Sequence, residues 1–557
     1  MSKGFMERGL EIHSPRMWDF AQVINALDFI EQYGMTSLIF HENELIDRVV
    51  FPEKYYTMEY MWKRFGPRYS RTLNKRYYLN NVIDECHKRG IKFIAEVKEI
   101  YFDEWIIELH PEVINPRTHR LCPSHPFWLE YMEAKMDEFL KYVPDVDGVI
   151  VSPGTRESKL SIVANKCGCD LCSNSNDAEW IGKILKIMND KLTVKGKFLV
   201  VRDFAFNAED QTIILEGAKM TSKDIIIALK YTPHDYFPTF PTNPAIGKSG
   251  HEEWVEFDVW GQFIGNGVFP VSLVEDFKSR MKEIHDKGVK GVWFRTDWEN
   301  MDDHCVFNSP NILNLIAGAM LSRDIDTDVD EIYREWTRFG MLSPLKSASF
   351  IQKPVPVTSE SKYTRLRDFM RASWNIMQKT VFVRGPVFQD NSMFPSTMER
   401  GFGIMLDIMS LDSWQPEASK KVEPTLENLE IILEEKRQAV QESQKLAEIL
   451  DADSLGLPED IAFDLKDMMD IYTYYTRCFE LAAKACFWCR RAEITCDMED
   501  RDKTLKVLDE IREYIPLLKE RITRRTYTHE IRRLIDYKRF EELIRNINEH
   551  LDKVNFK

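Results

Sequence analysis

The 557-residue sequence contains no apolar run long enough to cross a membrane, and its first residues lack the apolar core of a signal peptide. It also has no excess of basic residues, since 75 Lys and Arg stand against 90 Asp and Glu, a formal net charge of −15. A general nucleic-acid binder needs a cationic surface, so that function class is disfavoured. We therefore expect neither a membrane nor a nucleic acid as partner.

Cysteine, glycine and proline are sparse. Ten cysteines are too few for a disulfide scaffold in a chain of this length, which favours a reducing compartment and predicts a cytoplasmic protein. With 24 Gly, 24 Pro and 44% apolar residues, the composition excludes collagen-like and disordered chains. The sequence shows no phosphate-binding loop, dinucleotide fingerprint or serine-hydrolase elbow in a supporting context, so it does not indicate those chemistries.

Short apolar runs alternate with helical patterns over residues 1–330. Each run is four to six residues long, is rich in Val, Ile and Phe, and lacks strict alternation, as expected of parallel strands buried on both faces. Eight such strands with helices between most of them predict an α/β fold, a (β/α)₈ TIM barrel. The predicted strands are Leu10–His13, Ser37–Phe40, Lys92–Val97, Gly148–Val151, Phe198–Val201, Ile225–Leu229, Trp254–Val259 and Gly291–Phe294.

The remaining residues, 331–557, show helical patterns and no convincing strand. Charges recur at helical spacing, as in LEEKRQAVQESQKLAEIL, which indicates solvated helix faces. We therefore expect an all-helical C-terminal domain, and we leave open a homodimer formed through it. The predicted helices are Thr327–Gly340, Ser361–Lys379, Leu426–Leu450, Pro458–Ala492 and Asp502–Asp552.

The carboxyl ends of the predicted strands carry carboxylates, cations and aromatic residues. In a barrel of this type the catalytic side chains come from those ends. Paired carboxylates beside aromatic rings are typical of glycoside hydrolases, in which one acid protonates the leaving oxygen and a carboxylate activates water or attacks. The strand ends and the loops after them offer His13, His41, Glu96, Lys98, Glu157, Arg202, Lys230, Asp235, Asp258, Gln262, Arg295, Asp297, Trp298 and Glu299.

Four segments are similar to the α-glucuronidase family of glycoside hydrolases. They are VVRDFAFN, KYTPHD, VEFDVWGQFIGNG and DWENMDDHCVFNSPN, at the ends of the fifth to eighth strands. The resemblance implies a barrel followed by a helical domain. It also implies an exo-acting, inverting hydrolase that removes a terminal (4-O-methyl)glucuronic acid from xylan-derived oligosaccharides. The small N-terminal domain of that family has no counterpart here, because the first predicted strand begins almost at once.

The resemblance also implies roles for individual residues. Glu157, in SPGTRES after the fourth strand, corresponds to the general acid, and Asp235 to a carboxylate that activates the attacking water. The second such carboxylate of the family is replaced by Gln262, which can orient water but cannot accept a proton. In that family cationic side chains bind the carboxylate of the uronic acid, and the resemblance implies the same role for two cations of this sequence. The residues implied to bind substrate are Arg202 and Lys230, which supply those cations, and Trp298, Asp297 and His304.

Other interpretations stay open at this point. The departure at Gln262 and the unusual loop after the fourth strand are compatible with a glycosidase for another sugar, such as galacturonic acid, a hexosamine or a neutral hexose. A catalytically weakened carbohydrate-binding barrel is a third interpretation. Structural roles also compete: Asp235 would cap a turn, and Arg202 and Lys230 would belong to an ion-pair network.

Three cysteines, Cys167, Cys169 and Cys172, lie within six residues of each other, and the first follows Glu157 by ten residues. Thiolates so close together are typical ligands of Zn²⁺, and Cys122 or His125 on the preceding strand-to-helix loop would be the fourth ligand. Four protein ligands leave no open position, so this zinc would be structural, and we expect no cofactor for catalysis. Free thiols fit the spacing equally well, and a disulfide fits it less well.

Overall fold

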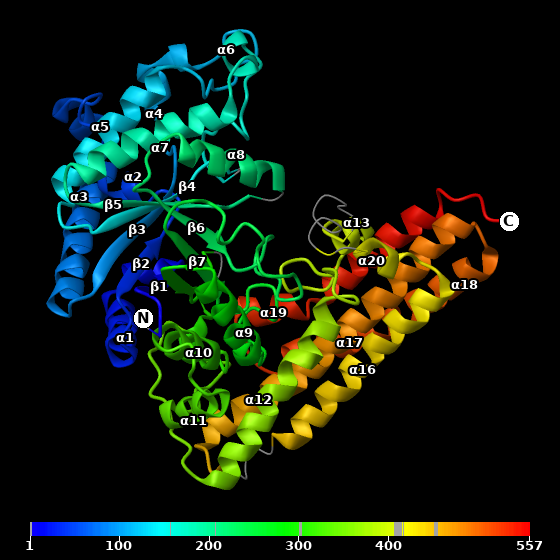
Figure 1. Ribbon diagram of the computed structural model, residues 1–557. Coiled ribbons are helices and arrows are strands. Elements are labelled where there is room, and N and C mark those ends of the chain that lie inside the picture. The colour runs from blue at the N-terminus through cyan, green and yellow to red at the C-terminus, as the bar shows by residue number, and fades with distance from the viewer. Residues whose placement is uncertain are drawn as a thin grey trace.

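Eight parallel strands close into a barrel in the order in which they occur along the chain (Figure 1). The computed structural model describes residues 3–155, 157–205, 208–299, 303–405, 415, 417–450 and 455–557. The predicted TIM barrel is confirmed, and every predicted strand is present with its ends shifted by at most three residues. The strands are β1 (Glu7–Ile12), β2 (Ser37–His41), β3 (Lys92–Lys98), β4 (Gly148–Ser152), β5 (Phe198–Arg202), β6 (Ile226–Lys230), β7 (Glu253–Asp258) and β8 (Gly291–Arg295).

Helices surround the barrel, as the alternating pattern predicts. Several of them end at a glycine; Gly34, for example, adopts a φ of 64°, and its N–H donates to the last carbonyls of α1. Between β6 and β7 the described chain has no helix, in agreement with the irregular pattern of that link. The helices are α1 (Phe20–Tyr33), α2 (Leu45–Val49), α3 (Met58–Lys88), α4 (Trp105–Leu109), α5 (Phe127–Tyr142), α6 (Asp170–Ser173), α7 (Asp177–Thr193), α8 (Ala208–Lys219), α9 (Val274–Asp286) and α10 (Ile312–Arg323).

The C-terminal region is helical, as expected, and its long helices run side by side away from the barrel (Figure 1). The single helix predicted over Asp502–Asp552 is wrong, because three helices occupy that range. Side chains of Thr528 and Asp536 accept backbone N–H groups and so begin two new helices. The helices are α11 (Val329–Phe339), α12 (Glu360–Val381), α13 (Met398–Phe402), α15 (Ala418–Val422), α16 (Leu426–Ile449), α17 (Glu459–Thr495), α18 (Met498–Thr523), α19 (His529–Leu534) and α20 (Tyr537–Leu551).

None of the helices in the described part of the chain has the length and apolar character needed to span a membrane.

Inside the barrel, the side chains change from apolar at one end to charged at the other. One part of the interior is filled by an apolar cluster, which consists of Ile39, Ile94, Ile150, Val200, Ala228, Trp254 and Trp293. Nearer the carboxyl ends of the strands the buried side chains are charged, and these are Glu11, Glu96, Arg202, Glu256 and Arg295.

A short hairpin of the C-terminal region, 390–393, packs on the segment that follows β7. Asn391 and Ser392 have φ values of 47° and 65°, which is the backbone of a tight two-residue hairpin turn. The Ser392 hydroxyl donates to the carbonyl of Gln262 at 2.9 Å and accepts the N–H of Gly265 at 2.8 Å. Because Ser392 is fully buried, these bonds fix the hairpin firmly at the mouth of the barrel.

Candidate active site

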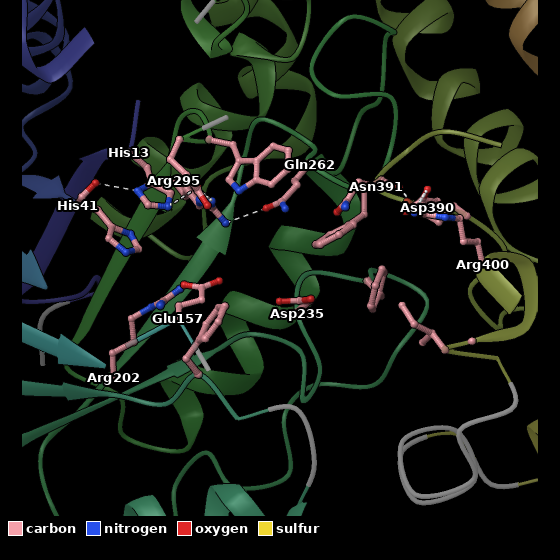
Figure 2. A pocket seen from close by; sticks show the side chains of 18 of the residues that line it. His13, His41, Glu157, Arg202, Asp235, Gln262, Arg295, Asp390, Asn391 and Arg400 are labelled. Carbon is pink, nitrogen blue, oxygen red and sulfur yellow. Dashed lines mark hydrogen bonds and ion pairs between the residues drawn. The ribbon is translucent and has the colours of Figure 1, made fainter. Parts of the chain in front are cut away.

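A cavity of about 420 Å³ lies at the carboxyl ends of the strands, which is where TIM barrels carry their active sites. Figure 2 shows barrel residues on one side and residues of the C-terminal region on the other, with Asp235 between them. The lining residues are His13, His41, Lys98, Glu157, Arg202, Phe204, Asp235, Phe237, Gln262, Phe263, Arg295, Trp298, Glu299, Gln389, Asp390, Asn391, Glu399, Arg400, Gly403 and Ile404.

Glu157 and Asp235, the predicted acid and base, both line this cavity (Figure 2). The side chain of Glu157 is 39% exposed, and its Oε2 lies 3.3 Å from Nζ of Lys98. The Tyr101 hydroxyl donates to the Glu157 carbonyl at 3.1 Å and so holds the backbone of this loop. Burial lowers the pKa of Lys98 by more than the charge of Glu157 raises it, so Lys98 releases its proton more readily than an exposed lysine.

Asp235 is held in a backbone conformation that few residues adopt. Its φ is 43°, in the left-handed region, and the Thr232 hydroxyl donates to its carbonyl at 2.6 Å. The side chain accepts from Lys230 Nζ at 2.6 Å. Burial alone would raise the pKa of Asp235, but the charges of Lys230 and His234 outweigh burial and lower it. The carboxylate is therefore ionised at neutral pH.

Arg202 and Lys230, the predicted uronate-binding cations, already have carboxylate partners within the protein. Arg202 is 1% exposed and binds Glu256 in a bidentate manner, with Nε and Nη2 at 2.6 and 2.8 Å from the two oxygens. Its Nη2 also donates to the hydroxyl of Tyr236 at 2.9 Å. Arg202 still borders the cavity, whereas Lys230 is not among the lining residues because it turns toward Asp235.

Gln262 faces the cavity through its amide. The Oε1 atom accepts from Arg295 Nη1 at 2.9 Å, so the NH₂ end is the group that remains to bind water or sugar. Arg295 also approaches Glu299 at 3.5 Å, and its buried Nε lies 3.8 Å from an oxygen of Glu11. Arg295 therefore has one close hydrogen-bond partner, Gln262, and two more distant carboxylates.

His13 lies beside Arg295, and both approach the carboxylate of Glu299. Its Nδ1 lies 2.7 Å from the His41 carbonyl, and its Nε2 lies 2.6 Å from a carboxylate oxygen of Glu299. Both neighbours are hydrogen-bond acceptors, so the two ring nitrogens of His13 are already engaged within the protein. Burial would raise the pKa of Glu299, but the charges of His13 and Arg295 lower it to about 2. Burial, together with the charges around it, lowers the pKa of His41 well below its usual range, so that ring is neutral.

Deeper in the barrel, buried carboxyl groups surround the guanidinium groups of Arg202 and Arg295. Burial, followed by repulsion from Glu256, raises the pKa of Glu11 to about 7, and burial raises that of Glu96 well above its usual range. Glu11 accepts from the indole N–H of Trp293 at 2.7 Å and pairs with His41 at 2.8 Å. Glu256 instead stays ionised, because the charge of Arg202 outweighs its burial and lowers its pKa.

The other three predicted substrate-binding residues lie in different surroundings. Trp298 lines the cavity. Asp297 is 1% exposed and accepts from the N–H of His13 at 2.6 Å, the hydroxyl of Ser14 at 2.6 Å and Arg16 at 2.8 Å, and it does not line the cavity. His304 is also buried away from the cavity, and a ring nitrogen lies 2.9 Å from the Thr528 hydroxyl. Burial lowers the pKa of His304 to about 4.

A second cavity of about 490 Å³ adjoins the first, and both are bordered by His13, His41 and Glu299. Trp18 lines it, and its indole N–H donates to Glu42 at 3.1 Å. Trp254, Trp260 and Trp293 are buried, so Trp18 and Trp298 are the cavity-lining residues among the tryptophans at the barrel's strand ends.

Sequence reasoning missed the contribution of the C-terminal region. Asp390, Asn391 and Arg400 reach the cavity (Figure 2), although they lie more than 90 residues beyond the last strand. Glu399 from the same region also lines it. Arg400 Nη1 donates to Asp390 at 2.7 Å, which orients this wall. The available sequence signal was the pair of turn-forming residues after Asp390. It indicates a turn but not where the turn docks.

No protein-family model matches the chain, and no curated protein matches it. A solved structure described as a GH138 enzyme targeting pectin rhamnogalacturonan II matches with a TM-score of 0.65 and 15% identity, over 99% of this chain and 83% of that one. A second, CpGH84B, has a TM-score of 0.43 and 10% identity, over 98% and 77% of the two chains. A β-N-acetylhexosaminidase from Bacteroides fragilis has a TM-score of 0.38 and 15% identity, over 59% and 69%.

At 15% identity, the first match shows a shared fold that includes both the barrel and the helical region. The other two matches are too distant to support an argument. All three structures belong to glycoside hydrolases other than α-glucuronidases. The specific resemblance to α-glucuronidases therefore stays a prediction.

The raised pKa of Glu11 leads to a prediction about stability. An unfolded chain loses this proton at about pH 4.3, whereas the folded protein keeps it up to about pH 7. Between those values the folded state binds more protons, so the contribution of Glu11 to stability falls as the pH rises. Glu11→Gln, which resembles the protonated form, should melt with a smaller difference between pH 5 and pH 8 than the parent protein. Glu427→Gln, on an exposed helix face, is the control, and equal pH dependence in all three proteins would contradict the assignment.

Proposed function

We propose that the protein is an exo-acting, inverting glycoside hydrolase that removes a terminal uronic acid from oligosaccharides. Glu157 protonates the leaving oxygen, and Asp235 accepts a proton from the attacking water. The observation that carries the proposal is that these two carboxyl groups face one cavity from the ends of strands that are not neighbours. β5 separates β4 from β6 in the closed barrel, which favours the wide spacing of an inverting enzyme, roughly 6.5–9.5 Å.

The surroundings of Asp235 suit the role of a base. Asp235 is ionised, as a base must be, and Lys230 fixes its orientation. Lys98 lies next to Glu157, and burial lowers the pKa of its ammonium group, so we assign to Lys98 the return of a proton to the acid after each turnover. Gln262 offers its NH₂ group to the cavity and can hold a water or a sugar hydroxyl without accepting a proton.

An acidic sugar fits the cations of the cavity. Arg295 and His13 both line it, and Nη2 of Arg295 approaches Glu299 only at 3.5 Å. A carboxylate on the sugar would be a closer partner for this guanidinium group and would neutralise charge in a partly dry site. We therefore assign uronate recognition to Arg295 and His13, with Arg202 and Lys230 supporting the site from below through Glu256 and Asp235.

Aromatic rings supply the surface on which a sugar ring would stack. Four of them line the cavity, and Lys98 and Lys230 lie 4.3 and 4.0 Å from the centre of the Phe204 ring. These cations cover part of that ring, so the other rings are the better platforms. The four aromatic residues are Phe204, Phe237, Phe263 and Trp298.

Galacturonic acid is the second candidate sugar. The structural match with the same overall fold is described as targeting a rhamnogalacturonan, which by its name contains this acid. Both uronic acids carry the same carboxylate and differ at a hydroxyl group, so the cation argument applies to each. We also propose a reducing compartment, which is supported by the ten cysteines, none of which is paired in a disulfide in the described structure.

The first test is a substrate panel. Aryl glucuronides and galacturonides, in both anomeric forms, are compared with the matching glucosides and galactosides. We expect turnover of a uronide and at least a hundredfold lower kcat/KM for the neutral sugar, since a lost ion pair in a partly buried site costs about 3 kcal/mol. Arg295→Lys should raise KM for the uronide and leave the neutral sugar unaffected. Faster cleavage of neutral sugars would contradict the uronate proposal.

The second test addresses the general acid. Glu157→Gln should lower kcat by about 10²–10⁴-fold on natural oligosaccharides, whose leaving groups need a proton. On an activated aryl glycoside, which departs without protonation, the loss should be much smaller. Glu399→Gln, another carboxyl group that lines the cavity, serves as the control and should change both rates by less than about tenfold. Equal losses on both substrates in Glu157→Gln would remove Glu157 from this role.

The third test compares the residues around the attacking water. Asp235→Asn should nearly abolish turnover of every substrate, because no other group here is assigned to take the proton. Gln262→Glu places a carboxylate beside Arg295, where it is neutralised, so activity should be kept or raised. Circular dichroism confirms that both variants fold. An Asp235→Asn variant that stays active would identify a different base.

A further inference from the structure

Four cysteines come together on the outer part of the barrel mouth, and we refer to them as the cysteine cluster: Cys122, Cys167, Cys169 and Cys172. We propose that the cysteine cluster binds one Zn²⁺ ion that holds two barrel loops together. Of the two fourth ligands compatible with the sequence, the structure brings Cys122 to the other three thiols. The proposal does not depend on the identity of the sugar.

The distances fit a tetrahedral metal site. Cys122 Sγ lies 3.6 Å from the Sγ atoms of Cys169 and Cys172, and Cys167 Sγ lies 3.6 Å from that of Cys172. All four sulfur atoms lie within 4.8 Å of one another. A zinc ion with four thiolates at about 2.3 Å places neighbouring sulfur atoms about 3.8 Å apart, so the thiols are already close to the required arrangement.

The local backbone suits thiolate ligands. Gly168 has a φ of 79°, which turns the chain sharply between two ligands. The N–H of Cys172 donates to Cys169 Sγ at 3.4 Å, and the side-chain amide of Asn115 donates to Cys167 Sγ at 3.5 Å. Four thiolates around Zn²⁺ carry a net negative charge, and N–H donors of this kind stabilise it and orient the ligands.

The site is closed, which points to a structural metal. Three of the four thiols are buried and the fourth, Cys169, is partly buried. Four protein ligands leave no position for water or substrate. None of the cluster residues lines the sugar cavity, so the metal takes no part in the reaction.

The consequence of metal binding is mechanical. Cys122 lies on the loop after β3 and the other ligands follow β4, so one ion would join both loops. The β4 loop also carries Glu157, and Glu99 on the β3 loop accepts the N–H of Gly154 at 2.9 Å and the hydroxyl of Ser158. Hydrogen bonds on both sides of Glu157 therefore attach the loop to its neighbour, and farther along the chain the cysteine cluster would attach it by metal bonds.

Metal content is the direct test. The full-length protein is purified without chelators or affinity metals and analysed by mass spectrometry for metals. We expect one zinc per chain, and well under one in Cys167→Ser and Cys172→Ser. Cys496→Ser, whose partly exposed thiol lies in the helical region away from the cluster, should keep its zinc. A zinc-free parent protein that takes up no zinc when supplied with it, or one equivalent of iron instead, would overturn the proposal.

A second measurement covers the case in which the serine variants fail to fold. Exchange of the parent protein with Co²⁺ should produce the intense sulfur-to-cobalt absorption and the visible bands of a tetrahedral thiolate site. Chelator should lower the melting temperature of the parent protein while the initial rate of the still-folded enzyme falls much less. In a last measurement, a thiol reagent is added to the folded protein before and after treatment with chelator. If the four thiols of the cysteine cluster react at once in the untreated protein, and at the same rate after chelation, the proposal is wrong whatever the enzyme's activity.

Discussion

Two guanidinium groups, those of Arg202 and Arg295, lie almost fully buried inside the barrel, and the rest of the site is arranged to keep them charged. Placing such charges in a low-dielectric interior is costly unless carboxylates and hydrogen bonds compensate them. Glu256 supplies the main compensation for Arg202, whereas Glu11 and Glu96 have raised pKa values. The interior therefore holds more positive charge than a count of its acidic residues suggests.

This excess of positive charge gives the cavity its chemical character. Asp235 stays ionised because Lys230 pairs with it, and Glu299 stays ionised because His13 and Arg295 do. In the proposed function an anionic sugar would pair with Arg295, whose carboxylate neighbours Glu299 and Glu11 lie 3.5 and 3.8 Å away. The hairpin of the C-terminal region then closes the cavity on the side opposite the barrel, so the helical region contributes to the site as well as to the fold.

The fold was predictable because its signals are local. Each strand is a short apolar run, and parallel strands buried on both faces need no other pattern. The positions of Glu157 and Asp235 followed from the rule that strand ends converge, and Cys122 was one of two ligands that the loop order allowed. The division of the last predicted helix was missed because it depends on the capping side chains of Thr528 and Asp536, which resemble ordinary polar residues of a solvated helix.

The rest of the site depends on contacts that leave no local pattern. Ser392 binds the backbone of Gln262 across 130 positions of sequence, so the role of the hairpin cannot be read from either segment alone. Likewise, Asp297 follows a strand end, as a substrate-binding residue would. Its carboxylate oxygens, however, already accept hydrogen bonds from His13, Ser14 and Arg16. Residue type and spacing indicate which side chains reach the barrel mouth, but the packing decides which of them remain available to a ligand.

The measurement that tests the central claim most directly is proton NMR of the first product formed from a uronide that the enzyme cleaves. Acid and base that act across the cavity, with water between them, must invert the anomeric centre. An α-linked substrate should therefore release the β-anomer first, and the α-anomer should grow in only at the rate of spontaneous mutarotation. Release of the α-anomer first would show retention, and the assignment of Glu157 and Asp235 as an inverting pair would be wrong.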